Sequence, residues 1–104
     1  MKHESTFQAD LKKELFSLFP GCEILKTDAN DIQGFPDLII LYENKWAALE
    51  CKRSLREIYQ PNQEFYIEKL DGMSFASMIC PENKEAVLDE LQQAFSTRWP
   101  TRLS

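Results

Sequence analysis

The sequence predicts a small α/β or α+β fold in which a mixed sheet is flanked by helices, with the element order αβββαβα. Two observations predict it. Apolar residues recur with helical periodicity in three segments, near the start, after the middle and at the end of the chain. Between these segments lie short apolar runs bounded by Gly, Pro, Asn and Asp, a pattern typical of strands and turns. The 104 residues suit one domain, 1–104, with one modest core.

The first helix is expected to begin near Thr6, because STFQ at residues 5–8 is a capping-box pattern. Four apolar residues then recur at helical spacing: Phe7, Leu11, Leu15 and Leu18. The sequence FPG at residues 19–21 ends this helix. A short strand over residues 22–26 follows, and then a loop over residues 27–34 that is rich in Asp, Asn and Gly.

Two apolar strands come next, at Leu38–Tyr42 and Trp46–Cys51. The polar sequence ENK between them is short enough for a hairpin, so the two strands are expected to pair antiparallel. Trp46 shares a strand face with Glu50. This parity places Trp46 in the core or at its rim, with a dimer or DNA contact as the alternative.

The second half of the chain repeats helix and strand. Residues 53–60 are polar and irregular. A second helix is expected to begin at Pro61 and to end at Gly72. An apolar strand over residues 73–80 follows, and the segment 81–83 introduces a last helix. The inner stripe of that helix is Val87, Leu91, Ala94 and Phe95.

Composition excludes several classes of protein. No apolar run approaches the roughly 18 residues of a membrane span, and the N-terminus lacks the apolar middle of a signal peptide. A cytoplasmic protein, bacterial or phage-encoded, with no membrane partner is therefore expected. The three cysteines are too scattered for a disulfide framework or a CxxC zinc site. The one histidine, His3, argues against His-based triads and His-rich metal sites.

The formal net charge of −5 counts against nucleic-acid binding, because neutralising phosphates requires Lys and Arg. It does not exclude such binding. The distribution of charge matters more than its sum, and carboxylates gathered around a metal ion raise the negative count.

The hairpin brings three charged residues together. If the turn lies at residues 43–44, Asp37 falls opposite Glu50 within about one residue, and cross-strand neighbours lie about 5 Å apart. Glu50 and Lys52 point to the same face because side chains alternate along a strand. Two carboxylates this close repel each other unless a cation lies between them. A hard divalent ion with oxygen ligands, Mg²⁺ above all, suits such a pair.

Two residues on helices join this candidate site. Glu14 lies within the apolar face of the first helix, three residues after Leu11. Gln63 begins an inward stripe of the second helix that continues with Tyr66, Ile67 and Leu70. A buried polar group without a partner is costly, and one shared polar site would satisfy both side chains. A partly exposed Glu14, and a Gln63 that caps its helix or lies in the core, are the alternatives.

These residues resemble a known nuclease family. PD at Pro36–Asp37 and ECK at Glu50–Lys52 resemble the PD-(D/E)xK motif, which implies a restriction-endonuclease-like core. More narrowly, GFPDLII, ALECK and QPNQEFYIEKLDGMSFASMIC resemble the virus-type replication-repair nuclease domain, VRR-NUC, of the stand-alone phage and bacterial kind. Three residues match that family around its motif: Gly34, Gln63 and Gly72. The spacing of Gln63 and Tyr66 departs from related nucleases, which leaves Tyr66 outside the expected site.

The resemblance implies metal-dependent hydrolysis of phosphodiester bonds in DNA. Asp37 and Glu50, with the backbone carbonyl of Cys51, would hold one or two Mg²⁺ or Mn²⁺ ions. Lys52 would orient the attacking water and stabilise the transition state. Glu14 would act through a metal-bound water or as a further ligand. Gln63 would position a phosphate or the attacking water.

The resemblance also implies partners. Stand-alone members are similar to Holliday-junction resolvases, so a homodimer acting on a four-way DNA junction is expected. Four basic residues are candidates for contacts with the DNA backbone, with plain solvated charges as the alternative: Arg53, Arg56, Lys12 and Lys13. Trp99 and the basic tail after it are either disordered or an element for dimer or DNA contacts. A monomeric flap or nicking nuclease, and a non-catalytic module that binds protein or DNA, are the competing functions.

Overall fold

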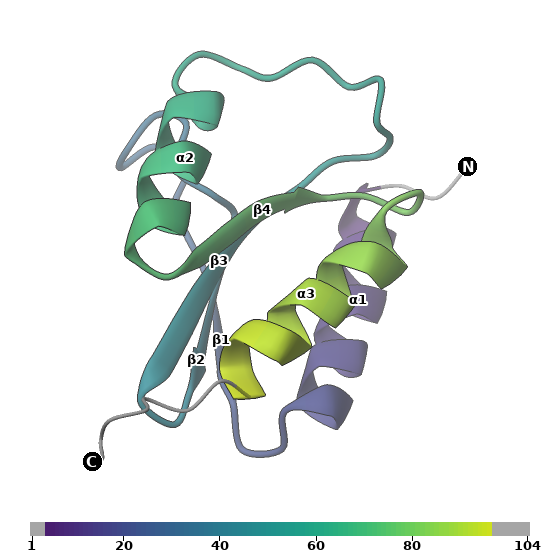
Figure 1. Ribbon diagram of the computed structural model, residues 1–104. Coiled ribbons are helices and arrows are strands. Elements are labelled where there is room, and N and C mark those ends of the chain that lie inside the picture. The colour runs from purple at the N-terminus through teal and green to yellow at the C-terminus, as the bar shows by residue number, and fades with distance from the viewer. Residues whose placement is uncertain (1–3, 97–104) are drawn as a thin grey trace.

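The structure is a computed structural model that describes residues 4–96. Its elements in chain order are α1 (Glu4–Leu18), β1 (Glu23–Lys26), β2 (Leu38–Tyr42), β3 (Lys45–Cys51), α2 (Gln63–Met73), β4 (Phe75–Ile79) and α3 (Lys84–Ser96) (Figure 1). This order confirms the predicted αβββαβα arrangement. Among the described residues, no helix has the length and apolarity to cross a membrane. Trp99 and the tail lie outside the described residues.

The four strands form one mixed sheet in the order β1-β2-β3-β4. The first three strands pair antiparallel and β4 pairs parallel with β3. Helices α1 and α3 cover one face of the sheet and α2 covers the other (Figure 1). The larger core cluster lies under α1 and α3, and a smaller one, built around Ala48, Leu70 and Ala76, lies under α2.

The hairpin of β2 and β3 has the predicted register. Tyr42 pairs with Lys45 across the turn, and Leu38 pairs with Leu49 at the other end. Glu43, in the turn, has a backbone φ of 58°, which is the left-handed region that two-residue hairpin turns use. The next pair beyond Leu38 and Leu49 is Asp37 opposite Glu50, so the predicted juxtaposition follows from this register.

Helix α2 differs from the prediction at both ends. It begins at Gln63, not at Pro61, because Asn62 adopts a left-handed backbone with φ 71° that cannot continue a helix. Gly72 lies inside the helix, which ends at Met73 with the Ser74 amide bonded to the Leu70 carbonyl. The predicted inward stripe is confirmed, because Gln63 is partly buried and Leu70 is buried.

The other helices differ from their predicted stripes by single positions. In α1, Leu18 is exposed and Phe19, beyond the helix end, fills the core instead. In α3, Ala94 is exposed and Leu88 is buried. Three strands are also shifted: β1 and β3 begin at Glu23 and Lys45, and β4 spans the shorter range Phe75–Ile79.

Candidate functional site

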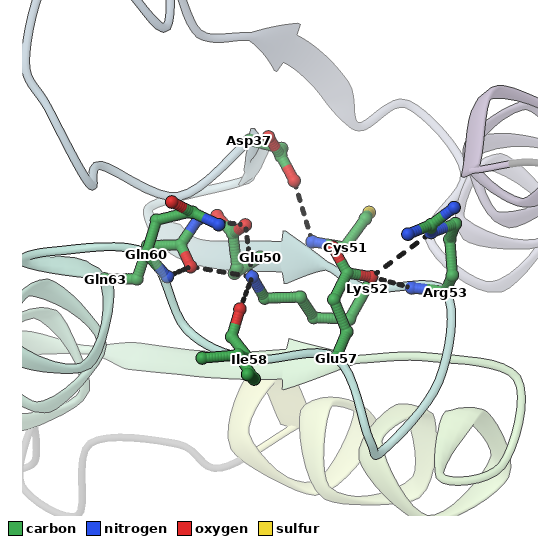
Figure 2. Close-up of polar contacts among 9 residues, drawn as sticks. All are labelled: Asp37, Glu50, Cys51, Lys52, Arg53, Glu57, Ile58, Gln60 and Gln63. Atoms are coloured by element: carbon green, nitrogen blue, oxygen red, sulfur yellow. Dashed lines mark hydrogen bonds and ion pairs between the residues drawn. The ribbon is translucent and has the colours of Figure 1, made fainter.

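Asp37 reaches across the open end of the hairpin. Its Oδ2 atom accepts a hydrogen bond of 2.8 Å from the backbone N–H of Cys51 on β3 (Figure 2). Thr27, just after β1, contacts the Pro36–Asp37 segment from the side opposite to β3. The Thr27 N–H donates to the Asp37 carbonyl at 2.8 Å, and the Thr27 hydroxyl donates to the Pro36 carbonyl at 2.7 Å. The Pro36–Asp37 turn is therefore fixed between β1 and β3.

Glu50 and Lys52 lie at the end of β3 on the face covered by α2. They alternate with Leu49 and Cys51, which belong to the core under α1 and α3. Glu50 is only 4% exposed and Lys52 only 2% exposed. Their charged atoms, Oε2 and Nζ, are 3.9 Å apart. Charges this deeply buried require partners that replace the lost hydration.

Gln63, the first residue of α2, supplies those partners. Its Nε2 donates to Glu50 Oε2 at 2.8 Å, and its Oε1 accepts from Lys52 Nζ at 2.7 Å (Figure 2). The same Oε1 accepts a hydrogen bond of 2.6 Å from the Gln60 backbone N–H. One amide group thus joins the carboxylate, the ammonium and the loop before α2. The structure thus brings Gln63 into contact with Glu50 and Lys52, while Asp37 contacts Cys51 between them in sequence.

The loop between β3 and α2 adds two contacts that the sequence did not indicate. Lys52 Nζ donates to the Ile58 carbonyl at 3.3 Å, and the Tyr59 ring lies with its centroid 5.4 Å from the same nitrogen. A backbone carbonyl carries no sequence signal, and Tyr59 lies in a segment without periodicity. The Tyr66 ring packs on Phe35 at a centroid distance of 5.5 Å.

Burial shapes the electrostatics of Asp37. Desolvation is the largest influence and raises the pKa of its carboxyl above the ordinary 3.8, with a smaller contribution from Glu57. The Cys51 N–H and the charges of Lys26 and Lys52 act in the opposite direction. The balance leaves the pKa raised, so the carboxylate form is under-stabilised. A cation beside Asp37 would offset this cost.

Glu14 was expected at this site, and the structure places it elsewhere. Its carboxylate forms an ion pair with Lys84 at the start of α3, and this hydrogen bond raises the pKa of the Lys84 ammonium. Helix α1 lies under the sheet face opposite to Glu50. Glu14 is thus partly exposed and contacts α3, because its position on the helix does not specify which side of the sheet it lies on.

Two of the four basic candidates lie in the loop beside the site, and the other two lie on the opposite side of the sheet. Arg53 is exposed and turns towards Glu57, with 3.7 Å between Nε and Oε1. The Glu57 carboxylate also accepts a hydrogen bond of 2.6 Å from the Arg53 backbone N–H. Arg56 is exposed in the same loop. Lys12 and Lys13 belong to α1, on the other side of the sheet from Glu50.

The residues present fit a magnesium-type ion better than a dedicated metal cage. Within residues 4–96, no group of three or more His, Cys, Asp or Glu side chains is placed to hold a metal ion. Asp37 lies opposite Glu50 at the open end of the hairpin, and its carboxylate contacts the backbone N–H of Cys51, the residue after Glu50. Mg²⁺ takes one or two protein carboxylates and completes its octahedron with water and substrate phosphate. The under-stabilised carboxylate of Asp37 is consistent with such a cation.

No family model, curated protein or solved structure matches the chain. The geometry of the site is therefore the basis on which a function is proposed.

Proposed function

We propose that the chain is a metal-dependent endodeoxyribonuclease of the PD-(D/E)xK type, similar to the VRR-NUC domain that its motifs resemble. The observation that carries this proposal is the convergence of Asp37, Glu50 and Lys52 at one end of the sheet, joined by Gln63. Two buried charges and one desolvated carboxylate destabilise a small domain. Their clustering at one end of the sheet supports a catalytic role over a structural one.

The carboxylates and the lysine would divide the work. Asp37 and Glu50, with the Cys51 carbonyl, would hold Mg²⁺ or Mn²⁺. A bound ion of this kind lowers the pKa of a water ligand and neutralises charge on the scissile phosphate. Within the chain itself, the Cys51 N–H fixes the orientation of Asp37, and Gln63 fixes Glu50. Gln63 acts as a positioning residue, because both ends of its amide are engaged by protein groups.

Lys52 would stabilise the transition state by donating to a phosphate oxygen or to the attacking water. Its ammonium holds Gln63 Oε1 at 2.7 Å and the Ile58 carbonyl at the longer distance of 3.3 Å. The Ile58 contact is the weaker of the two. DNA binding would exchange it for a phosphate oxygen, and the shorter bond to Gln63 would keep the ammonium aimed.

The preferred substrate would be a four-way DNA junction, as the resemblance to stand-alone VRR-NUC domains implies. A small domain with one site needs two copies to make paired cuts, so the enzyme would act as a homodimer. Arg53 and Arg56, exposed beside the site, and Lys12 and Lys13 on α1 would contact the DNA backbone. A monomeric flap or nicking nuclease is the enzymatic alternative. Sedimentation at micromolar concentration distinguishes them, since a monomer argues against symmetric cutting.

Cleavage of synthetic DNA tests the proposal. Four-way junctions, flaps and single strands are incubated with wild type in Mg²⁺, in Mn²⁺ and in EDTA. We expect metal-dependent cutting that Asp37→Ala and Lys52→Ala abolish. Lys45→Ala is the matched control. Lys45 is the first residue of β3, at the end of the strand opposite to Lys52. A wild type that cuts none of these substrates with either ion overturns the proposal.

A non-catalytic module is the second candidate, and one observation favours it. Glu50, Lys52 and Gln63 form hydrogen bonds and an ion pair with one another. The cluster is therefore also consistent with a structural, buried polar network. The acidic surface implied by the net charge of −5 would then bind a protein or DNA partner. In the cleavage assay this candidate predicts inert wild type, and the nuclease predicts cutting.

A further inference from the structure

Lys26 lies beside Asp37 on the side away from Lys52. It is the last residue of β1 and pairs with Leu38, the residue after Asp37. The next residue, Thr27, donates its backbone N–H to the Asp37 carbonyl at 2.8 Å. The charge of Lys26 is felt at Asp37, where it opposes the rise in the carboxyl pKa that desolvation causes. This lysine therefore belongs to the surroundings of the candidate site, although no sequence pattern indicated it.

A buried amide holds the Lys26 side chain. Lys26 Nζ donates to Gln8 Oε1 at 3.2 Å, and Gln8, on α1, is only 7% exposed. Lys26 itself is exposed. Within residues 4–96, Gln8 is the one hydrogen-bond partner described for this ammonium. An ammonium carries three donors, and Gln8 accepts from one of them.

The neutral character of this partner is informative. Lys45, Lys52 and Lys84 each pair with a carboxylate, which cancels their charge locally. Lys26 is hydrogen-bonded to an amide instead, and its charge acts on the Asp37 carboxyl without a hydrogen bond to it. The exposed ammonium stays accessible to an incoming anion. A compact ammonium with free donors binds phosphate oxygen well.

The two lysines at this end of the sheet lie on opposite faces. Lys26 shares the face of its partner Leu38, which belongs to the core under α1 and α3. Lys52 contacts Gln63 of α2 and so lies on the other face. Asp37, at the strand end, lies between them in the chain of contacts from Thr27 to Cys51. A nucleic-acid strand that crosses this end of the sheet would pass close to both lysines.

We propose that Lys26 is a second phosphate-binding lysine of the site, which contacts a phosphodiester next to the scissile one, and that Gln8 is its positioning residue. This inference rests on the proposed function, since it takes DNA as the ligand. Lys52 serves the reacting phosphate, and Lys26 sets the register of the strand by holding its neighbour.

The test measures binding and chemistry separately. Fluorescence anisotropy of a labelled four-way junction is recorded with Ca²⁺ from about 50 to 200 mM salt. For Lys26→Gln we expect the slope of log K against log salt to fall by about 0.9, the value for one lost phosphate contact on duplex DNA, with affinity roughly fivefold to tenfold lower. In steady-state cleavage KM rises and kcat stays near wild type. Lys26→Arg keeps most of the affinity.

Two further variants test whether the effect is specific to the charge of Lys26. Lys45→Gln, at the far end of the hairpin, is the matched control and leaves the salt slope unchanged. Gln8→Glu keeps the size of the side chain and gives Lys26 a carboxylate partner. It should reproduce the loss seen in Lys26→Gln, because the ammonium is then neutralised in place. Circular dichroism checks that both variants are folded.

The outcomes separate this inference from the proposed function. If wild type cuts DNA and Lys26→Gln keeps the wild-type salt slope and KM, the inference fails and the nuclease stands. If wild type binds DNA without cutting and the slope falls in Lys26→Gln, the phosphate contact stands and the nuclease fails. If wild type neither binds nor cuts, both fail.

Discussion

Gly34 packs directly against Asn62. A Cβ atom added to Gly34 would lie 2.7 Å from the Asn62 Cβ and 2.7 Å from the Pro61 carbonyl oxygen, closer than side chains approach. Both residues have left-handed backbones, with φ of 86° and 71°. Gly34 precedes the Pro36–Asp37 turn and Asn62 precedes Gln63. This contact therefore positions the segment that carries Asp37 next to the segment that carries Gln63.

Gly34→Ala is expected to destabilise the fold and to impair the site. The new methyl group strains a left-handed backbone and displaces the Pro61–Asn62 segment, which costs about 2 kcal/mol or more of unfolding free energy. The displaced segment carries Gln63, so DNA cleavage should fall further than the loss of folded protein explains. Urea denaturation and cleavage at a temperature where the variant stays folded measure the two effects.

Gly72→Ala is the matched control for that substitution. Gly72 lies inside α2, and a Cβ there meets no heavy atom within 4 Å. Alanine should stabilise this helix by about 0.5 to 1 kcal/mol and leave cleavage unchanged. Equal stability of the two variants would contradict the role given to the contact between Gly34 and Asn62.

Local patterns were sufficient to predict the elements and the hairpin. Turn length fixed the pairing of Tyr42 with Lys45, and alternation then placed Glu50 and Lys52 on one face. Gln63 was found because the α2 stripe has a clear helical period. Each of these relations depends on residues close in sequence or joined by one turn.

Contacts between distant segments escaped prediction for physical reasons. The start of α2 is set by the approach of Gly34 to Asn62, which no helix propensity encodes. The Ile58 carbonyl that holds Lys52 is a backbone group in an irregular loop. For Glu14, amphipathicity showed only that the residue faces the body of the protein. Which helix lies beneath it is a tertiary property, and that helix is α3.

Gln63→Leu tests the amide that joins Glu50 to Lys52. Leucine has a similar size but leaves a buried carboxylate and ammonium without their shared partner, which costs about 2 to 4 kcal/mol. Cleavage should fall at least tenfold in protein shown to be folded. Gln60→Leu is the matched control, because Gln60 contacts Gln63 through its backbone N–H and carbonyl and its side chain is exposed. If the two variants behave alike, the bridge has no energetic role.

Glu14→Gln distinguishes the position of Glu14 in the structure, beside α3, from the catalytic role expected from the sequence. The ion pair with Lys84 is partly exposed, so its loss should change stability by less than about 1 kcal/mol. The structure predicts cleavage close to wild type, since Glu14 contacts α3. A hundredfold loss of cleavage in folded Glu14→Gln, with DNA binding intact, would instead restore Glu14 to the catalytic machinery.

Asp37→Asn should stabilise the fold at neutral pH while it removes activity. Burial raises the pKa of Asp37, so the folded state holds the proton more tightly than the unfolded state. Ionisation of this carboxyl therefore costs stability, and that cost grows as the pH rises through the folded pKa. Asparagine mimics the protonated form and should add roughly 0.5 to 2 kcal/mol at pH 7, the usual size of a single stabilising substitution.

The advantage of Asp37→Asn should vanish below the unfolded pKa of 3.8, where wild type is protonated in both states. Denaturant midpoints of both proteins, measured at steps of about half a pH unit from about pH 3.5 to about pH 8, test this convergence. Asp31→Asn, in an exposed loop, is the control and should track wild type throughout. A stability difference independent of pH would show that packing and not ionisation distinguishes Asp37 from asparagine.

Divalent metal should stabilise wild type and fail to stabilise Asp37→Asn. A ligand that binds only the folded state adds RT ln(1 + [L]/Kd), which is about 1.4 kcal/mol at a tenfold excess over Kd. The cation also offsets the desolvation cost of the Asp37 carboxylate. The stability gained on metal binding and the instability of the metal-free protein therefore both arise at Asp37. Thermal unfolding with increasing Mg²⁺ or Ca²⁺ measures the effect without DNA. Asp31→Asn should retain the full metal response, and an equal response in Asp37→Asn would place the ion away from Asp37.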